Sequence, residues 1–323
     1  MTKNKSIIKR TIPNIAYIGS GNISKFHIPA LKKAGFNISS ISSRKNSKNI
    51  LSFAKKFKIS NIIYDWNDLL DCKNDYDAIM IAVTTDVTSK ILKKLIHTKK
   101  PILVEKPVSN KSNEIKKLIN NNSKNVFVAY NRRHYVSTEF AKKFIDSKSN
   151  VHANIFLPEM NKTSLYQNGC HVINLVNYLF DQINLKYLHP INFGNKTFGF
   201  TSFFINKRGD SINLISNYKS PSNFKIEIIH RDEKIEMLPI EKAYLYKGLK
   251  IIPPNKNSTI RKYVPNLISK SEDELFEKLL KPGFYSQSKS FHEFVKYGIY
   301  DKKLCTLKES QETIKIIEQI APK

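Results

Sequence analysis

Short apolar runs alternate with helical stretches through residues 14–129, and this alternation restricts the fold more than any other feature of the chain. Uninterrupted runs such as residues 78–83 (Ala-Ile-Met-Ile-Ala-Val) are typical of buried parallel strands. The helical stretches between them are long enough to return the chain to the same edge of a sheet. The pattern therefore predicts a parallel, doubly wound α/β sheet. Its predicted strands are residues 14–18, 37–41, 62–64, 78–83, 101–104 and 126–129.

The pattern changes after residue 129, so we predict two domains, 1–129 and 130–323, with the last helices able to pack back on the first domain. A predicted helix over 138–147 precedes consecutive strand-like segments separated by turn residues such as 207–210 (Lys-Arg-Gly-Asp). Such spacing favours an antiparallel sheet. The predicted strands are 151–156, 198–205, 211–218 and 224–230, and two further helices are predicted over 287–297 and 308–320.

Composition excludes several classes of protein. The longest apolar run is too short to cross a bilayer, and no signal-like apolar stretch follows the charged N-terminus. Cys72, Cys170 and Cys305 lie far apart, and the histidines show no metal-ligand spacing, so we expect no disulfide framework, no metal and a cytoplasmic protein. The formal net charge of +27 would attract phosphate-bearing ligands. The basic residues are scattered without an RNA-binding signature, so we expect no nucleic-acid partner.

A glycine turn, Gly19-Ser20-Gly21, lies between the first strand and a helix that ends at Gly35. Glycines at this spacing allow a tight turn and a close approach of a pyrophosphate to the helix N-terminus. We therefore predict that Gly19, Gly21, Asn22 and Ile23 bind a dinucleotide. A purely structural turn is the alternative.

The second strand ends at Ser43-Arg44, where dinucleotide folds usually carry an acidic residue for the ribose hydroxyls of NAD. A serine and an arginine suit the 2′-phosphate of NADP instead. NADP is thus favoured over NAD. The alternative is that Arg44 is a solvated arginine of a basic protein with no cofactor role. Thr84 follows the strand over 78–83 at the same edge of the sheet and is also predicted to contact the cofactor.

The tripeptide Glu105-Lys106-Pro107 closes the strand over 101–104. Proline cannot donate a hydrogen bond into a sheet, so the strand stops there and delivers a lysine to the edge where open α/β sheets bind ligands. A lysine held against apolar surroundings can exchange a proton near neutral pH. A solvated lysine at a strand end is the simpler alternative.

His171 precedes apolar residues at helical spacing, so we expect it near a helix start. The positive helix end would oppose charging of its imidazole and leave the ring available for proton exchange. A structural histidine is the alternative.

The order and spacing of four motifs resemble the Gfo/Idh/MocA oxidoreductases, named after glucose–fructose oxidoreductase, inositol dehydrogenase and a rhizopine catabolism protein. The motifs are the glycine turn, Glu-Lys-Pro, Ala129-Tyr130-Asn131-Arg132-Arg133 and Gly169-Cys170-His171, and the resemblance covers nearly the whole chain. It implies an N-terminal Rossmann domain and a C-terminal α/β domain whose open, mostly antiparallel sheet often forms a homo-oligomer interface.

The resemblance also implies the chemistry. A nicotinamide would exchange hydride with a sugar, including nucleotide-linked sugars, or with a cyclitol. Lys106, often followed by a cis bond to proline, would contact both substrate and nicotinamide ribose, with Glu105 beside it at the cofactor. His171 would transfer the proton. The matching positions place Arg133, Gln167 and Asn174 at the substrate.

The chain departs from the family where acidic residues are common, because Gln167 and Asn174 cannot ionise. Thr88 falls near a position that is often histidine. These departures fit a changed substrate pocket, and they also fit a catalytically reduced homologue that binds or senses a dinucleotide. An active enzyme is the preferred interpretation.

Overall fold

The computed structural model describes residues 12–43, 47, 49–71, 75–272 and 280–321. They form two compact units, which are described separately. The first contains the described residues of 12–131 together with 283–311, and the second contains those of 132–282 together with 312–321.

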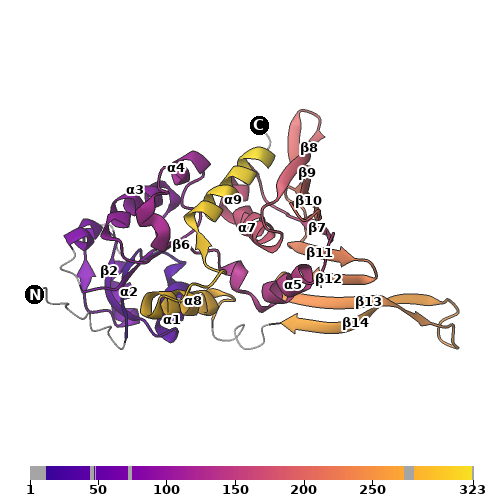
Figure 1. The fold of residues 1–323 in the computed structure, drawn as a ribbon, viewed down its shortest axis with the longest axis horizontal. Helices are drawn as coiled ribbons and strands as arrows, with labels where there is room; N and C mark the ends of the chain where they lie inside the picture. Colours follow the sequence, from indigo (N-terminus) through magenta and orange to yellow (C-terminus); the bar gives the residue numbers. More distant parts are fainter. Residues whose placement is uncertain (1–11, 44–46, 48, 72–74, 273–279, 322–323) are drawn as a thin grey trace, which may run out of the picture. The chain divides into compact units, whose positions relative to one another are not determined.

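The sheet of the first unit has seven strands among the described residues, in the order β15-β6-β5-β4-β1-β2-β3. Figure 1 labels β2 and β6 of this sheet. Strands β1 to β6 run parallel, and β15 is antiparallel to β6. The strand order reverses at β1, which lies between β2 and β4. The predicted doubly wound parallel sheet is confirmed. The bounds are β1 (Asn14–Ile18), β2 (Asn37–Ser42), β3 (Ile62–Ile63), β4 (Ala78–Ile81), β5 (Ile102–Val104), β6 (Val126–Val128) and β15 (Cys305–Thr306).

Helices cover both faces of this sheet. Strand residues Ile15, Tyr17 and Met80 share one buried cluster with residues of α1 (Ser24–Lys33), α2 (Ile50–Phe57) and α8 (Phe284–Tyr297). The residues that alternate with them, such as Ala16 and Ile79, are equally buried on the opposite face. Between the other strands lie α3 (Thr85–Leu95) and α4 (Ser112–Lys116), with the 3-10 helices η1 (Trp66–Asp71), η2 (Ile96–Thr98) and η3 (Asn121–Asn125).

The sheet of the second unit has eight strands among the described residues, in the order β14-β13-β12-β11-β7-β10-β9-β8. Only the β7–β10 pair is parallel among these neighbours. The predicted, mostly antiparallel sheet is therefore confirmed. The strands are β7 (His152–Phe156), β8 (Asn184–Phe193), β9 (Lys196–Ile205), β10 (Ser211–Asn217), β11 (Lys225–His230), β12 (Glu233–Met237), β13 (Lys242–Ile252) and β14 (Lys262–Glu272).

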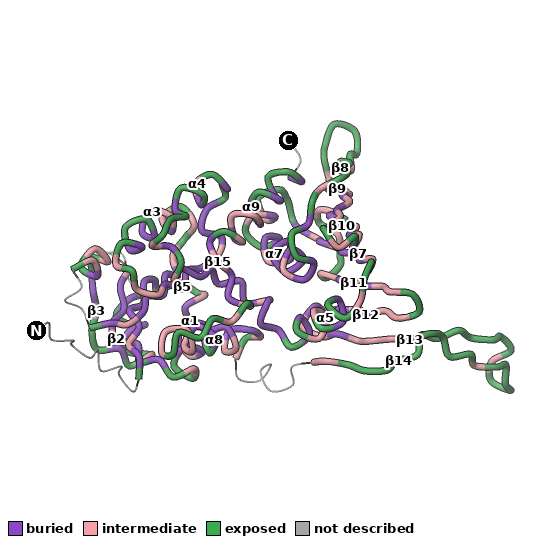
Figure 2. The backbone as a smooth tube through the Cα atoms, in the orientation of Figure 1, coloured by how far each residue is buried: buried purple, intermediate pink, exposed green. Residues whose placement is uncertain are grey.

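This second sheet is buried on one face only. Along β7, β10 and β11 buried residues alternate with partly exposed ones. Buried apolar residues of α5 (Val136–Asp146) and α7 (Cys170–Leu179) belong to the same unit (Figure 2). The remaining helical segments are η4 (Asn131–His134), α6 (Lys162–Ser164), the π-helical turn η5 (Leu165–Gly169) and α9 (Leu307–Ile320).

Strands β13 and β14 continue beyond the rest of their sheet. Strand β12 pairs with β13 only over residues 244–247, whereas the β13–β14 pairing continues to Ile252 and Lys262. The distal part of the hairpin is exposed (Figure 2). Among the described residues, no helix has both the length and the apolar character needed to cross a membrane.

Candidate functional site

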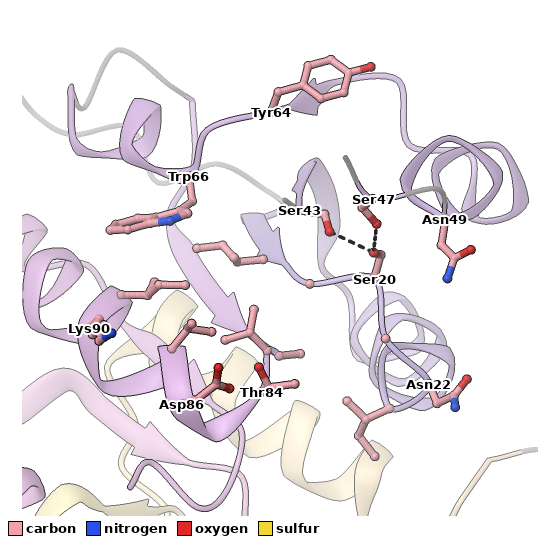
Figure 3. A pocket seen from close by; sticks show the side chains of 18 of the residues that line it. Ser20, Asn22, Ser43, Ser47, Asn49, Tyr64, Trp66, Thr84, Asp86 and Lys90 are labelled. Atoms are coloured by element: carbon pink, nitrogen blue, oxygen red, sulfur yellow. Dashed lines mark hydrogen bonds between the residues drawn. The ribbon is translucent and has the colours of Figure 1, made fainter. Parts of the chain in front are cut away.

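A pocket of about 800 Å³ opens beside β1, β2 and β4 of the first unit (Figure 3). This is the point where the strand order reverses, and open α/β sheets bind their ligands at such points. The lining contains six predicted cofactor residues: Gly19, Gly21, Asn22, Ile23, Ser43 and Thr84. The fold thus gathers the loops after three separate strands into one cavity.

The glycine turn is held against two neighbouring strands. Gly19 has a φ of 125°, a conformation that side chains disfavour, and its N–H donates to the Ser42 carbonyl at 2.7 Å. A Cβ on Gly19 would lie 2.0 Å from the carbonyl oxygen of Ala82. A Cβ on Gly21 would meet no atom within 4 Å, because Gly21 faces open pocket space. This open approach to the backbone is what a pyrophosphate requires.

Three serine hydroxyls lie together at the end of β2. The Ser20 Oγ is 3.0 Å from the Ser43 Oγ and 3.1 Å from the Ser47 Oγ (Figure 3). These groups can donate to and accept from the hydroxyls or phosphate of a ribose. Arg44, the other residue predicted here, lies outside the described residues.

Two carboxylates also line the pocket, and the sequence reasoning did not identify them. Asp65 precedes η1 and accepts hydrogen bonds from both the backbone N–H and the side chain of Asn67, which hold the pKa of its carboxyl below the ordinary value. Asp86 lies in the first turn of α3. Asp65 follows the glycine turn by more than forty residues, so no local motif indicates it. The Asx turn that Asp65 forms with Asn67 begins the 3-10 helix η1.

Thr84 is placed at the N-terminus of α3, with its carbonyl accepting a hydrogen bond from the Thr88 hydroxyl at 2.9 Å. Thr88 is buried. Its position inside the first unit therefore gives the hydroxyl a structural role in the first turn of α3.

Lys106 follows β5, as the sequence predicts, and the Lys106–Pro107 bond is cis. Its neighbour Glu105 is 8% exposed and does not line the pocket. The Glu105 carboxylate instead lies 2.5 Å from the His27 Nε2 through Oε1 and accepts from the Lys106 backbone N–H at 3.0 Å through Oε2.

His171 is the second residue of α7, near the start of that helix as predicted, but the positive helix end expected beside it lies elsewhere. The backbone is helical from α6 through the π-helical turn η5 into α7, and Ser164, Gly169 and Cys170 all have right-handed helical dihedral angles. The N-cap of this segment is Asn161, whose side chain accepts from the Ser164 N–H. The positive helix end therefore lies more than two turns before His171 and does not act on its imidazole. The π turn widens the helix just before the half-buried His171.

The three predicted substrate residues differ in exposure. Gln167 is exposed in the π turn, whereas Asn174 and Arg133 are 0% and 1% exposed. The Arg133 Nε donates to the Asn174 Oδ1 at 2.7 Å, and the Asn174 amide donates to the Thr313 hydroxyl at 2.8 Å. Arg133 also lies over the ring of Tyr178. The asparagine thus replaces an ionisable side chain with a neutral one that bridges two buried partners.

A buried glutamate lies beside the π turn and was not predicted. Glu159 is 4% exposed, and its Oε1 accepts from the Asn168 amide at 3.3 Å. Burial raises the pKa of the nearby Tyr218 hydroxyl to about 12, and the charges of Glu159 and Tyr166 act in the same direction. The sequence offered no sign of this buried position beyond an acidic residue, Glu159, in a strongly basic chain.

The first unit matches a known family. Residues 13–130 match the sequence profile described as "Oxidoreductase family, NAD-binding Rossmann fold", named GFO_IDH_MocA. A segment of 120 residues is 33% identical to the uncharacterized oxidoreductase YrbE of Bacillus subtilis. That match covers 36% of this chain and only 35% of the relative, about a third of its length.

Solved structures resemble the fold of both units. An Agrobacterium radiobacter oxidoreductase, solved with NAD+, L-tartaric acid and magnesium, has a TM-score of 0.73 at 13% identity and covers 96% of this chain and 95% of its own. A levoglucosan dehydrogenase, solved with NADH and levoglucosan, has a TM-score of 0.76 at 14% identity and covers 95% and 96%. Identities this low establish the shared fold alone. Residues 13–130 thus match the NAD-binding Rossmann domain of this oxidoreductase family, and the pocket of the glycine turn lies within them.

Proposed function

We propose that this protein is an NAD(P)-dependent oxidoreductase acting on a hydroxyl or ketone group of a sugar, including nucleotide-linked sugars, or of a cyclitol. The observation that carries the proposal is the pocket at the strand reversal, lined by the glycine turn of a domain that matches an NAD-binding family. The levoglucosan dehydrogenase with the same fold supports the substrate class by analogy.

The residues of the pocket suit a dinucleotide. Gly19 to Ile23 would hold the pyrophosphate, since Gly21 leaves open space above the backbone. The serine hydroxyls at the end of β2 would hold the adenosine ribose. When bound, the nicotinamide supplies or accepts a hydride.

The protein must orient the substrate and move one proton. We assign orientation of the reacting oxygen to the Lys106 ammonium and proton transfer to the His171 imidazole. Both residue types suit these roles, because an ammonium donates to hydroxyl and carbonyl oxygens and an imidazole exchanges protons near neutral pH. Lys106 belongs to the first unit and His171 to the second.

The proposal is tested by titrating NADH and NADPH into the protein, following coenzyme fluorescence, and then assaying a panel of keto-sugars, sugar alcohols and cyclitols. We expect coenzyme binding and turnover of at least one member. Tight binding without turnover on any of them would favour a dinucleotide-binding or sensing protein, for which the neutral Gln167 and Asn174 would be the reason.

The assigned roles are tested by Lys106→Ala and His171→Ala, with Lys124→Ala, an exposed lysine of the same unit as Lys106, as the control. We expect kcat to fall about a hundredfold or more in both site variants, with coenzyme affinity nearly kept in His171→Ala. Unchanged activity in Lys106→Ala would contradict the assignment.

We propose NADP over NAD as the preferred coenzyme, because Ser43 rather than a carboxylate follows β2. Ser43→Asp should reverse the preference, since a carboxylate repels a 2′-phosphate and accepts from ribose hydroxyls. The ratio of the NADPH and NADH dissociation constants measures this effect. A ratio that Ser43→Asp leaves unchanged would remove Ser43 from coenzyme selection.

We further propose a homo-oligomer formed through the sheet of the second unit. The open face of this sheet and the exposed apolar residues of β13 and β14 support it. Sedimentation of the full chain tests it, and a monomer at all concentrations would overturn it.

A further inference from the structure

A buried carboxylate joins the helix that follows the glycine turn to the strand end that carries Lys106. Glu105 follows β5, and His27 lies in α1. The His27 Nε2 lies 2.5 Å from the Glu105 Oε1, and the Glu105 Oε2 accepts from the Lys106 N–H at 3.0 Å. Each carboxylate oxygen therefore contacts a different segment of the first unit.

The surroundings hold this pair in one arrangement. His27 is 1% exposed and packs against the Phe284 ring of α8, with 4.7 Å between the ring centroids. The Tyr17 hydroxyl of β1 lies in the same interior, where burial raises its pKa and the Glu105 charge adds to the effect. Interactions with an ionised group strengthen away from water, so a carboxylate placed here is strongly directed toward its two partners.

We propose that His27 and Glu105 form a positioning pair that fixes the backbone of Lys106 relative to α1 and therefore relative to the bound coenzyme. The proposal rests on the function assigned to Lys106 above. It gives Glu105 a role different from direct cofactor contact, since both of its oxygens are already engaged and it does not line the pocket. Neither residue would touch the substrate.

The helix α1 begins directly after the glycine turn, so its position is tied to the pyrophosphate site. Lys106 follows β5, and its ammonium must be held within about 0.5 Å of the position that suits the reacting oxygen. The contacts from His27 of α1 to Glu105, and from Glu105 to the Lys106 N–H, therefore couple the position of Lys106 to that of α1.

Three variants test the pair. His27→Phe keeps an aromatic ring against Phe284 and removes the nitrogen that faces Glu105. His27→Gln places an amide N–H where it can still donate to Glu105. His292→Gln is the matched control, because His292 is a partly buried histidine of α8 in the same unit, in edge contact with Phe36 and outside the pocket.

The kinetic readout uses the best substrate of the panel described above. In His27→Phe we expect kcat to fall about tenfold or more while KM for the coenzyme changes little, because a misplaced group costs rate more than binding. His27→Gln should recover most of that loss, and His292→Gln should keep the original kcat. Equal losses in His27→Phe and His27→Gln would indicate a merely structural histidine and would overturn the proposal.

A second readout does not need turnover. The full chain is acylated with a limiting amount of an N-hydroxysuccinimide ester, and the rate at Lys106 relative to Lys124 is measured by mass spectrometry of peptides. We expect the relative rate to change several-fold in His27→Phe and in Glu105→Gln, and to stay unchanged in His292→Gln. A rate at Lys106 that neither variant alters would overturn the proposal, even if no substrate were found.

The two readouts separate the possible failures. If Lys106→Ala keeps full activity, the proposed function of Lys106 is wrong, whatever the acylation rates show. If Lys106→Ala is inactive while His27→Phe matches the original enzyme in both readouts, the function stands and the positioning pair is wrong.

Discussion

At the scale of single residues, the two glycines of the turn have different roles, because Gly19 packs against the Ala82 backbone and Gly21 faces the pocket. Gly19→Ala would place a Cβ 2.0 Å from the Ala82 carbonyl oxygen in a strained φ region, so we expect the free energy of unfolding to fall by roughly 2 kcal/mol or more. Gly21→Ala meets no atom within 4 Å, so its stability should stay within about 0.5 kcal/mol while its affinity for NAD(P)H falls.

Urea unfolding and coenzyme titration of both glycine variants test this contrast. A Gly19→Ala protein as stable as the original would show that the turn relaxes away from β4. An unaltered coenzyme affinity in Gly21→Ala would show that the pyrophosphate does not approach this residue.

His292 makes stability depend on pH. Burial lowers the pKa of its imidazole below the ordinary 6.5, Lys296 acts in the same direction, and Glu293 opposes them. The unfolded chain thus binds a proton at a pH where the folded chain does not, so this contribution to stability is present above 6.5 and is lost as the pH falls through the lower folded value. Urea unfolding from neutral to mildly acidic pH should show this decline, and His292→Gln should flatten it. An identical decline in both proteins would assign it to other groups.

At the scale of elements, the β13–β14 hairpin has an apolar face that its own unit does not cover. Ile251 and Tyr263 are paired across the two strands, so they share a face, and they are 56% and 58% exposed. A two-stranded ribbon is marginally stable alone in water. The hairpin is therefore the element in which an oligomer contact is best tested.

The double variant Ile251→Ser, Tyr263→Ser should weaken self-association measured by sedimentation, without lowering the stability of the isolated chain. Val264 lies on the opposite face, paired with Lys250, so Val264→Ser serves as the control. Equal sedimentation of the double variant and the original protein would exclude this face of the hairpin from the contact.

At the scale of the whole molecule, 54 basic residues stand against 27 acidic ones. Self-repulsion of a net charge of +27 destabilises the compact state, and salt screens it with a Debye length of about 8 Å at physiological ionic strength. We expect the thermal unfolding midpoint to rise by a few degrees when sodium chloride is added to a low-salt buffer. An uncharged osmolyte at the same osmolarity is the control. A midpoint that falls with added salt would show that attractive pairs dominate instead.

The sequence determined the local elements and their kind, because those depend on neighbours along the chain. The apolar residues 78–81 form a strand that is buried throughout, as their composition predicts. The glycine turn after β1 is predicted from its own residues, without reference to any distant segment. The distal hairpin strands escaped prediction because exposure on both faces removes the alternation that marks a strand. The helix start near His171 was predicted, but the π turn that continues the helical backbone upstream was not, so the positive helix end was placed too close to His171.

Only the tertiary structure decided which distant residues meet. It brought Asp65 into the pocket of the glycine turn, joined Arg133 to Asn174 and Thr313, and paired His27 with Glu105. Each of these contacts crosses tens of residues of chain. Their formation depends on how helices and strands pack to exclude water, which no local pattern encodes.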